Sequence, residues 1–302
     1  MIVAITGATG LIGSALTGSL TQGGHTVRRI GRGAPAPGST DVQWDPARGL
    51  LDPRALEGVD AVVHLAGASI SERWTVDHKR AIIDSRVQGT ALISRTLVQL
   101  DRKPAVLVSA SAVGWYGDRA GEVLDESSVG GNNWLAEVAR QWERAADPAR
   151  IAGIRVVHPR TGVVLSPRGG ALATLLPIFK LGAGGRIGGG VHWLSWISLS
   201  DAVSALTFML QHERAVGAMN VVSPGPVTNA EFTRVLAHLL HRPAIATVPQ
   251  FALSLVFGAE MTREVLVASQ RALPIALELG GFRFAHPSLE EALRFELGLR
   301  AG

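Results

Sequence analysis

Three glycines near the N-terminus are spaced as in a turn that binds phosphate. Gly7, Gly10 and Gly13 lie in the segment TGATGLIG, in the pattern G-x-x-G-x-x-G. Such glycines let backbone N–H groups approach a pyrophosphate where a helix begins, and the helix dipole favours negative charge there. A dinucleotide site is therefore predicted, with a merely tight turn as the alternative. Its predicted residues in this segment are Gly7, Thr9, Gly10, Leu11, Ile12 and Gly13.

The end of the second predicted strand bears on which dinucleotide would bind. The segment RRIGR (residues 28–32) is basic, and the first acid after it is Asp41. An acid at this point hydrogen-bonds the ribose 2′-hydroxyl of NAD, whereas an arginine accommodates the 2′-phosphate of NADP. We therefore expect Arg32 to bind that phosphate and NADP(H) to be preferred over NAD(H). The alternative is a solvated basic turn, or an arginine that stacks on adenine without selecting the phosphate.

The elements that position this turn alternate between short apolar runs and longer helical stretches, which is typical of βαβ units around a parallel sheet. Strands are predicted at residues 2–6, 26–30, 60–65, 105–109 and 154–158, and helices at 11–22, 75–100 and 132–146. The predicted fold class is α/β, a Rossmann-type doubly wound parallel sheet with a smaller, mainly helical C-terminal lobe.

The second half of the chain is less regular. Its glycine-rich segment 181–190 is predicted to be loop, because no regular helix would tolerate that composition. A strand at 218–222 and helices at 200–211 and 229–240 follow, the last with Asn229 as its cap, and Ser288 and Glu291 form a predicted capping box. We expect residues 1–165, joined by 195–222, to form the dinucleotide-binding domain, and residues 166–194 and 223–302 to form the substrate lobe and the C-terminal helical domain.

Composition excludes several classes of protein. The 302 residues include no cysteine, so disulfides, thiolate nucleophiles and cysteine-ligated zinc are excluded, and a cytoplasmic location is expected. The basic residues behind the net charge of +4 are scattered, so no nucleic-acid partner is expected. No uniformly apolar, uncharged stretch reaches about 18 residues, so no membrane partner is expected either. His238 and His241 lack a nearby acid, and no metal site is predicted.

Several motifs resemble a known family. The segments TGATGLIG (6–13), HLAG (64–67), SASAVGWYGD (109–118) and NVVSPGPVTNAEF (220–232) resemble the extended short-chain dehydrogenase/reductases. The segments HKRAIIDSRVQGT (78–90), HPRTGVVLSPRGGAL (158–172) and ASQRALP (268–274) are similar to its atypical epimerase-like subfamily, labelled NAD-dependent epimerase/dehydratase or SulA-like cell-division inhibitor. The resemblance covers the whole chain. It implies cofactor contacts at Leu65, Ala66 and Gly67, and a crevice wall at Arg73 and Trp74.

The resemblance also implies a catalytic pair that this chain lacks. Members of the superfamily use a Tyr as acid/base, with a Lys four residues later that lowers its pKa. The single tyrosine here is Tyr116, and the residue four places later is Ala120. The family's Tyr and Lys positions align with about Trp134 and Val138, neither of which exchanges a proton. Ser111 matches the family's carbonyl-binding Ser, so the predicted catalytic residues are Ser111 and, as a substitute acid, Tyr116.

Two further groups of residues have alternative interpretations. Lys180, Arg186, His192 and Trp193 surround the glycine-rich segment, where they would form either an anion-binding substrate mouth or a mobile surface loop. The apolar face that Trp134 shares with Val138 and Trp142 indicates core or a subunit interface, the latter implying a homodimer, and the alternative is a substrate platform.

The sequence thus predicts an NADP(H)-binding epimerase-like or oxidoreductase-like protein with an unknown small-molecule substrate. The alternative is an NADP(H)-binding regulatory or scaffold protein without turnover.

Overall fold

A mostly parallel sheet forms the centre of the molecule, in a computed structural model that describes residues 1–299. Its strand order is β14-β9-β6-β5-β1-β2-β3-β4, with β7 (Ser111–Ala112) added to β9, and only β3 and β4 run antiparallel. The strands are β1 (Ile2–Thr6), β2 (Thr26–Gly31), β3 (Val42–Asp45), β4 (Leu50–Leu51), β5 (Ala61–His64), β6 (Val106–Ser109), β9 (Arg155–Thr161) and β14 (Gly217–Val221). The order reverses between β1 and β5, which is where such sheets bind ligands.

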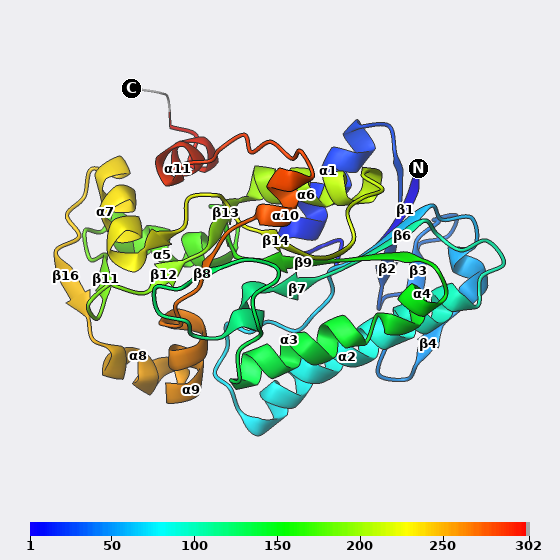
Figure 1. Cartoon of the computed structure of the whole chain (residues 1–302), viewed down its shortest axis with the longest axis horizontal. Helices are drawn as coiled ribbons and strands as arrows, with labels where there is room; N and C mark the ends of the chain where they lie inside the picture. The colour runs from blue at the N-terminus through cyan, green and yellow to red at the C-terminus, as the bar shows by residue number, and fades with distance from the viewer. Residues whose placement is uncertain (300–302) are drawn as a thin grey trace.

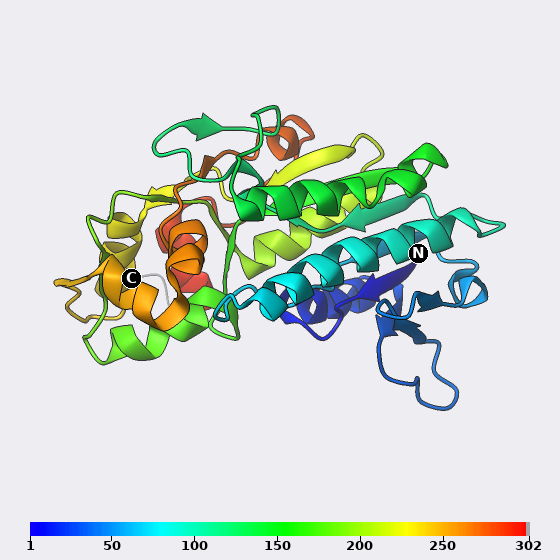
Figure 2. The same ribbon diagram turned by 90° about the horizontal axis from the view of Figure 1, so that it is seen from below.

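Helices cover both faces of this sheet (Figures 1 and 2). One face is covered by α1 (Leu11–Gln22) and α6 (Leu199–Gln211), and the other by α2 (Val76–Val98), α3 (Trp134–Arg144) and α4 (Asp147–Ile151). Successive side chains of β1 point to opposite faces of the sheet and so contribute to both helix–sheet interfaces. Val3 and Ile5 pack in the core under α1 and α6, while Ala4 packs in the core under α2. The predicted Rossmann-type fold is confirmed.

A smaller lobe follows the sheet, with its own apolar core of Leu165, Leu172, Phe179, Trp196 and Leu236 among others. Its helices are α5 (Gly170–Lys180), α7 (Asn229–Leu239), α8 (Gln250–Phe257), α9 (Ala259–Met261) and α11 (Leu289–Glu296), with a π-helical turn at Thr262–Leu266. Helix α10 (Ile275–Leu279) instead packs near β14.

Short two-stranded ladders lie in the smaller lobe and where it meets the sheet domain. They pair β10 (Val163–Leu165) with β13 (Trp196–Ser198), β12 (Trp193–Leu194) with β15 (Val227–Thr228), and β8 (Val123–Leu124) with β17 (Arg271–Ala272). Two 3-10 turns, Pro53–Leu56 and Val113–Tyr116, complete the regular structure.

Two local predictions in the second half were wrong. The glycine-rich segment is not all loop, because β11 (Gly185–Ile187) pairs with β16 (Ala246–Val248). The cap of α7 is Thr228, whose hydroxyl accepts the N–H of Glu231, whereas the Asn229 side chain accepts the N–H of Ile187 and so ties β11 to α7. The capping box of Ser288 with Glu291 is confirmed. Across residues 1–299, we find no helix with the length and apolarity that crossing a membrane requires.

Candidate functional site

A cleft of about 550 Å³ opens at the carboxyl ends of β1 and β5, where the strand order reverses. The glycine turn after β1 and the HLAG segment after β5 form two of its walls, and the end of β2 forms the third. The predicted residues that line it are Gly7, Thr9, Gly10, Arg32, Leu65, Ala66 and Gly67. Leu11, Ile12 and Gly13 lie in the first turn of α1, with Leu11 and Ile12 packed against the core.

Each glycine of the turn meets a different geometric requirement. Gly7 has φ +67°, and a Cβ there would lie 2.9 Å from the Ala66 nitrogen. A Cβ on Gly13 would overlap the Gly7 carbonyl oxygen and lie 2.9 Å from the Ala8 Cα, so this glycine lets α1 pack closely on β1. A Cβ on Gly10 would meet only the Gly7 oxygen, at 3.3 Å. The fold therefore does not require glycine at position 10, but the absence of a side chain there leaves space open in the cleft.

The rim of the cleft at the end of β2 is positively charged. Arg29 and Arg32 both line it and both are exposed. The first acid after them, Asp41, accepts a hydrogen bond from the Arg29 backbone nitrogen at 3.1 Å. Among the described residues, no carboxylate forms an ion pair with Arg32.

A buried pair of side chains holds the HLAG segment in place. The Thr6 hydroxyl accepts the N–H groups of Leu65 and Ala66, and it lies 2.7 Å from His64 Nδ1. Because the Thr6 oxygen already accepts two hydrogen bonds, it donates its own proton to an unprotonated Nδ1. Burial, with the nearby charge of Arg86, lowers the pKa of His64 to about 4. A neutral His64 thus fixes the backbone that forms this wall.

A second cavity, of about 170 Å³, lies between the sheet domain and the smaller lobe. Its walls are mainly apolar, and Val138 and Trp142 of α3 are among them. Val138, which the sequence matches approximately to the family's Lys, is thus in the cavity wall. Trp134, matched in the same way to the Tyr, instead packs against Trp74 with ring centroids 4.6 Å apart. The apolar face of α3 is therefore part core and part cavity wall.

The structure does not place the Tyr116 hydroxyl in either cavity. Tyr116 is fully buried, its hydroxyl donates to Asn220 Oδ1 at 2.7 Å, and Arg160 donates to it at 3.2 Å. Burial raises the pKa of Tyr116 despite the opposing effect of Arg160. The substitute-acid prediction therefore has no geometric support, because the phenol is enclosed in a structural network.

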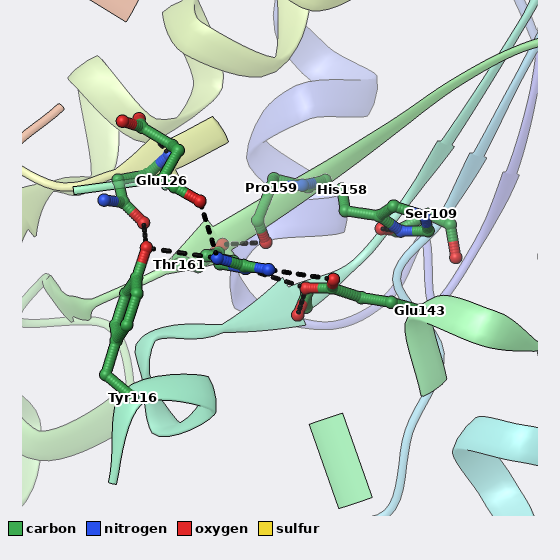
Figure 3. Close-up of polar contacts among 10 residues, drawn as sticks. Ser109, Tyr116, Glu126, Glu143, His158, Pro159 and Thr161 are labelled. Carbon is green, nitrogen blue, oxygen red and sulfur yellow. Dashed lines mark hydrogen bonds and ion pairs between the residues drawn. The ribbon is translucent and has the colours of Figure 1, made fainter. Parts of the chain in front are cut away.

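Ser111 belongs to the same network. Its hydroxyl donates to Glu143 Oε1 at 2.7 Å, and Glu143 also forms a buried ion pair with Arg160 at 2.9 Å. Figure 3 shows the Tyr116 hydroxyl and the Glu143 carboxylate directed toward one buried guanidinium between them. Ser111 is 4% exposed, and its neighbour Ala112, not Ser111, lines the second cavity. Its proton is committed to Glu143, so in this arrangement Ser111 has no proton to donate to a substrate.

The other predicted substrate residues lie outside both cavities. Arg73 donates to the Leu255 carbonyl at 3.4 Å, and Trp74 donates to the Ile70 carbonyl at 3.0 Å. Lys180 and Arg186 are exposed near the glycine-rich segment, and Arg271 lies 4.1 Å over the Trp193 ring. Arg73 and Trp74 were predicted from the family resemblance, and the other three from their positions around the glycine-rich segment. None of the five lines either cavity.

Sequence reasoning missed the polar groups that do line the second cavity. They are Arg86 of α2, Thr161 at the end of β9, Glu264 of the π-helical turn, and Gln270 just before β17. A π-helical turn is a frequent feature of functional sites, but the sequence carries no signal for it. Arg86 lies in the segment HKRAIIDSRVQGT, whose pattern indicates the epimerase-like family but no role for this arginine.

Comparison with known proteins identifies the family. Residues 3–223 match the profile of the NAD dependent epimerase/dehydratase family, and residues 248–296 match a domain of unknown function, DUF1731. The chain belongs to the NAD dependent epimerase/dehydratase family. It is 45% identical over 295 residues to an epimerase family protein of Mycobacterium bovis, with 97% of each chain covered. It is 38% identical over 297 residues to the epimerase family protein YfhF of Bacillus subtilis, again with 97% of each covered.

Solved structures agree with this assignment. The human epimerase family protein SDR39U1, determined with NADPH, superposes with a TM-score of 0.89 at 32% identity and 99% coverage of both chains. The resemblance to atypical epimerase-like members of the family is thus confirmed. Glu264 and Gln270 both fall within the DUF1731 match, so that domain contributes to the wall of the second cavity.

Proposed function

We propose that this epimerase-family protein binds NADP(H) in the 550 Å³ cleft, in preference to NAD(H), and uses the adjoining cavity for a small-molecule substrate. The observation that carries the proposal is the combination of an open Gly10 at the start of α1 with exposed arginines at the end of β2. The human relative determined with NADPH supports the same choice.

The cleft fits a dinucleotide phosphate at both ends. At the glycine turn, a Cβ on Gly10 would occupy space beside the N-terminus of α1, where backbone N–H groups and the helix dipole favour a pyrophosphate. At the end of β2, no carboxylate within residues 1–299 pairs with Arg32, and Asp41 is engaged by the backbone of Arg29. A 2′-phosphate would therefore meet one or two free guanidinium groups.

The chemistry proposed is that of an oxidoreductase or epimerase with a non-standard site. A bound NADP(H) supplies or accepts a hydride. The chain's own residues orient the cofactor through the glycine turn and the HLAG segment, and they enclose the substrate between apolar walls. Neither Tyr116 nor Ser111 has a proton available to the cavity, so neither supplies the usual acid–base assistance of about 10²- to 10⁴-fold. That observation favours a second candidate, an NADP(H)-binding regulatory or scaffold protein without turnover.

Calorimetric titration of NADPH and NADH against the wild type and Arg32→Ala tests the proposal. Loss of one charge-assisted contact is worth about 1.5–3 kcal/mol, so NADPH affinity is expected to fall about tenfold or more while NADH affinity changes little. Arg48→Ala is the matched control, because Arg48 is exposed and lies outside the cleft. Equal affinity of the wild type for the two nucleotides, or an unchanged preference in Arg32→Ala, would refute the proposed selectivity.

A further inference from the structure

The guanidinium of Arg86 is a charged group without a charged partner in the second cavity. Its Nη1 donates to the carbonyl oxygens of Ala68 at 3.0 Å and Ile82 at 3.2 Å. Within residues 1–299, no carboxylate comes within ion-pair distance of it. A guanidinium has five N–H donors, so the two backbone contacts leave donors for another acceptor.

The surrounding residues hold this guanidinium in one position. A Cβ on Gly67 would lie 3.3 Å from Arg86 Cζ, so the glycine of HLAG leaves the room that the side chain occupies. On the other side, Arg86 Cζ lies 4.9 Å from the centre of the Trp142 ring. Burial lowers the pKa of Arg86 to about 10, which leaves the group charged at neutral pH. A confined charge without a counter-ion is unfavourable, and an anion beside it would relieve that penalty.

The rest of the cavity defines what kind of anion would fit. Its other lining side chains are mostly apolar, including Ile70, Val113, Leu135, Val138, Val163 and Val265. The acid in the wall, Glu264, already accepts hydrogen bonds from the Asn133 side chain and the Leu135 nitrogen, each at 3.0 Å. The volume of 170 Å³ is below the roughly 300–1,000 Å³ of sites for drug-sized ligands, which excludes a complete nucleotide sugar in this space.

We propose that the second cavity binds a small carboxylate with an apolar body, its carboxylate paired with Arg86 and its body against Val138, Trp142 and Val163. A planar guanidinium matches a planar carboxylate through two parallel hydrogen bonds. That this carboxylate is the substrate rests on the proposed function, because the cavity lies beside the proposed dinucleotide cleft. That the cavity binds a carboxylate depends only on the residues that line it.

The test compares 4-methylpentanoate with 4-methylpentanamide, a neutral compound of nearly the same shape, by calorimetry on the full chain with and without saturating NADP⁺. The wild type is expected to bind the carboxylate about tenfold or more tightly than the amide, which is the size of one charge-assisted contact. Arg86→Gln is expected to remove that difference, and Arg86→Lys to restore part of it. Arg80→Gln is the matched control, an exposed arginine of the same helix that does not line the cavity.

Equal affinity of the wild type for acid and amide, or no binding of either, would overturn the inference even if Arg86→Gln failed to fold. Inorganic phosphate that competes equally with the carboxylate would overturn the assigned ligand class. If Arg86→Gln weakened NADPH instead and the wild type ignored the carboxylate, Arg86 would be a cofactor residue and the proposed function would stand. If the wild type bound the carboxylate but neither nucleotide, the proposed function would fail and this site would remain.

Discussion

Alanine at Gly13 is expected to destabilise the fold, whereas valine at Gly10 is expected to remove nucleotide binding without doing so. A Cβ on Gly13 would overlap the Gly7 carbonyl oxygen and press on the Ala8 Cα, and both are backbone atoms that cannot rotate away. Forced overlap of this kind costs about 1–3 kcal/mol, and the upper end applies when backbone must move. Alanine in place of glycine otherwise stabilises a helix by about 1 kcal/mol.

The net expected loss for Gly13→Ala is therefore about 2 kcal/mol of unfolding free energy, or roughly 3 °C in Tm for a chain of this length. Gly10 has extended backbone angles, φ −73° and ψ 175°, which valine adopts without strain. Its added atoms would enter the cleft, so Gly10→Val is expected to lose NADPH binding while unfolding within about 1 kcal/mol of the wild type.

Urea and thermal unfolding followed by circular dichroism, with calorimetric titration of NADPH, separate the two effects. Gly18→Ala is the matched control, since it lies in the same helix and a Cβ there meets nothing within 4 Å. That variant is expected to be as stable as the wild type or slightly more so. The reasoning would be refuted if Gly13→Ala matched Gly18→Ala in stability, or if Gly10→Val bound NADPH normally.

Two other substitutions address the buried polar groups. Tyr116→Phe removes the hydroxyl between Asn220 and Arg160, so we expect the unfolding free energy to fall by about 1–3 kcal/mol while NADPH affinity stays unchanged. A large fall in NADPH affinity without a loss of stability would instead show that the phenol reaches the cofactor. For His64, the folded-state pKa of about 4 lies below the ordinary 6.5, so its neutral form contributes stability that is complete above pH 6.5 and is lost as the pH falls toward 4. That contribution is about 3 kcal/mol, and urea unfolding from pH 7 to 5 should show a shallower dependence in His64→Gln than in the wild type. Parallel curves would mean that the buried imidazole does not titrate as the structure requires.

Local patterns in the sequence were sufficient to predict most of the residues that meet at the cleft between the ends of β1 and β5. The turn of Gly7 and Gly10 lies between a strand and a helix whose bounds, 2–6 and 11–22, coincide with β1 and α1. Arg32 follows β2 directly, and HLAG follows β5. Because parallel strands present their carboxyl ends at one edge of the sheet, residues that follow consecutive strands must meet there. For this cleft, position along the chain determines position in space.

The second cavity depends on contacts that no local pattern encodes. Glu264 reaches the start of α3 from 129 residues away, and Arg86 and Trp142 meet across two helices. Tyr116 had the motif of a site residue, yet long-range packing against Asn220, 104 residues away, encloses its hydroxyl. The sequence by itself determined the order of βα units and the glycine turn after β1, since these follow from spacing and backbone freedom. Only the tertiary structure decided which side chains share a cavity, because that depends on how the smaller lobe packs against the sheet.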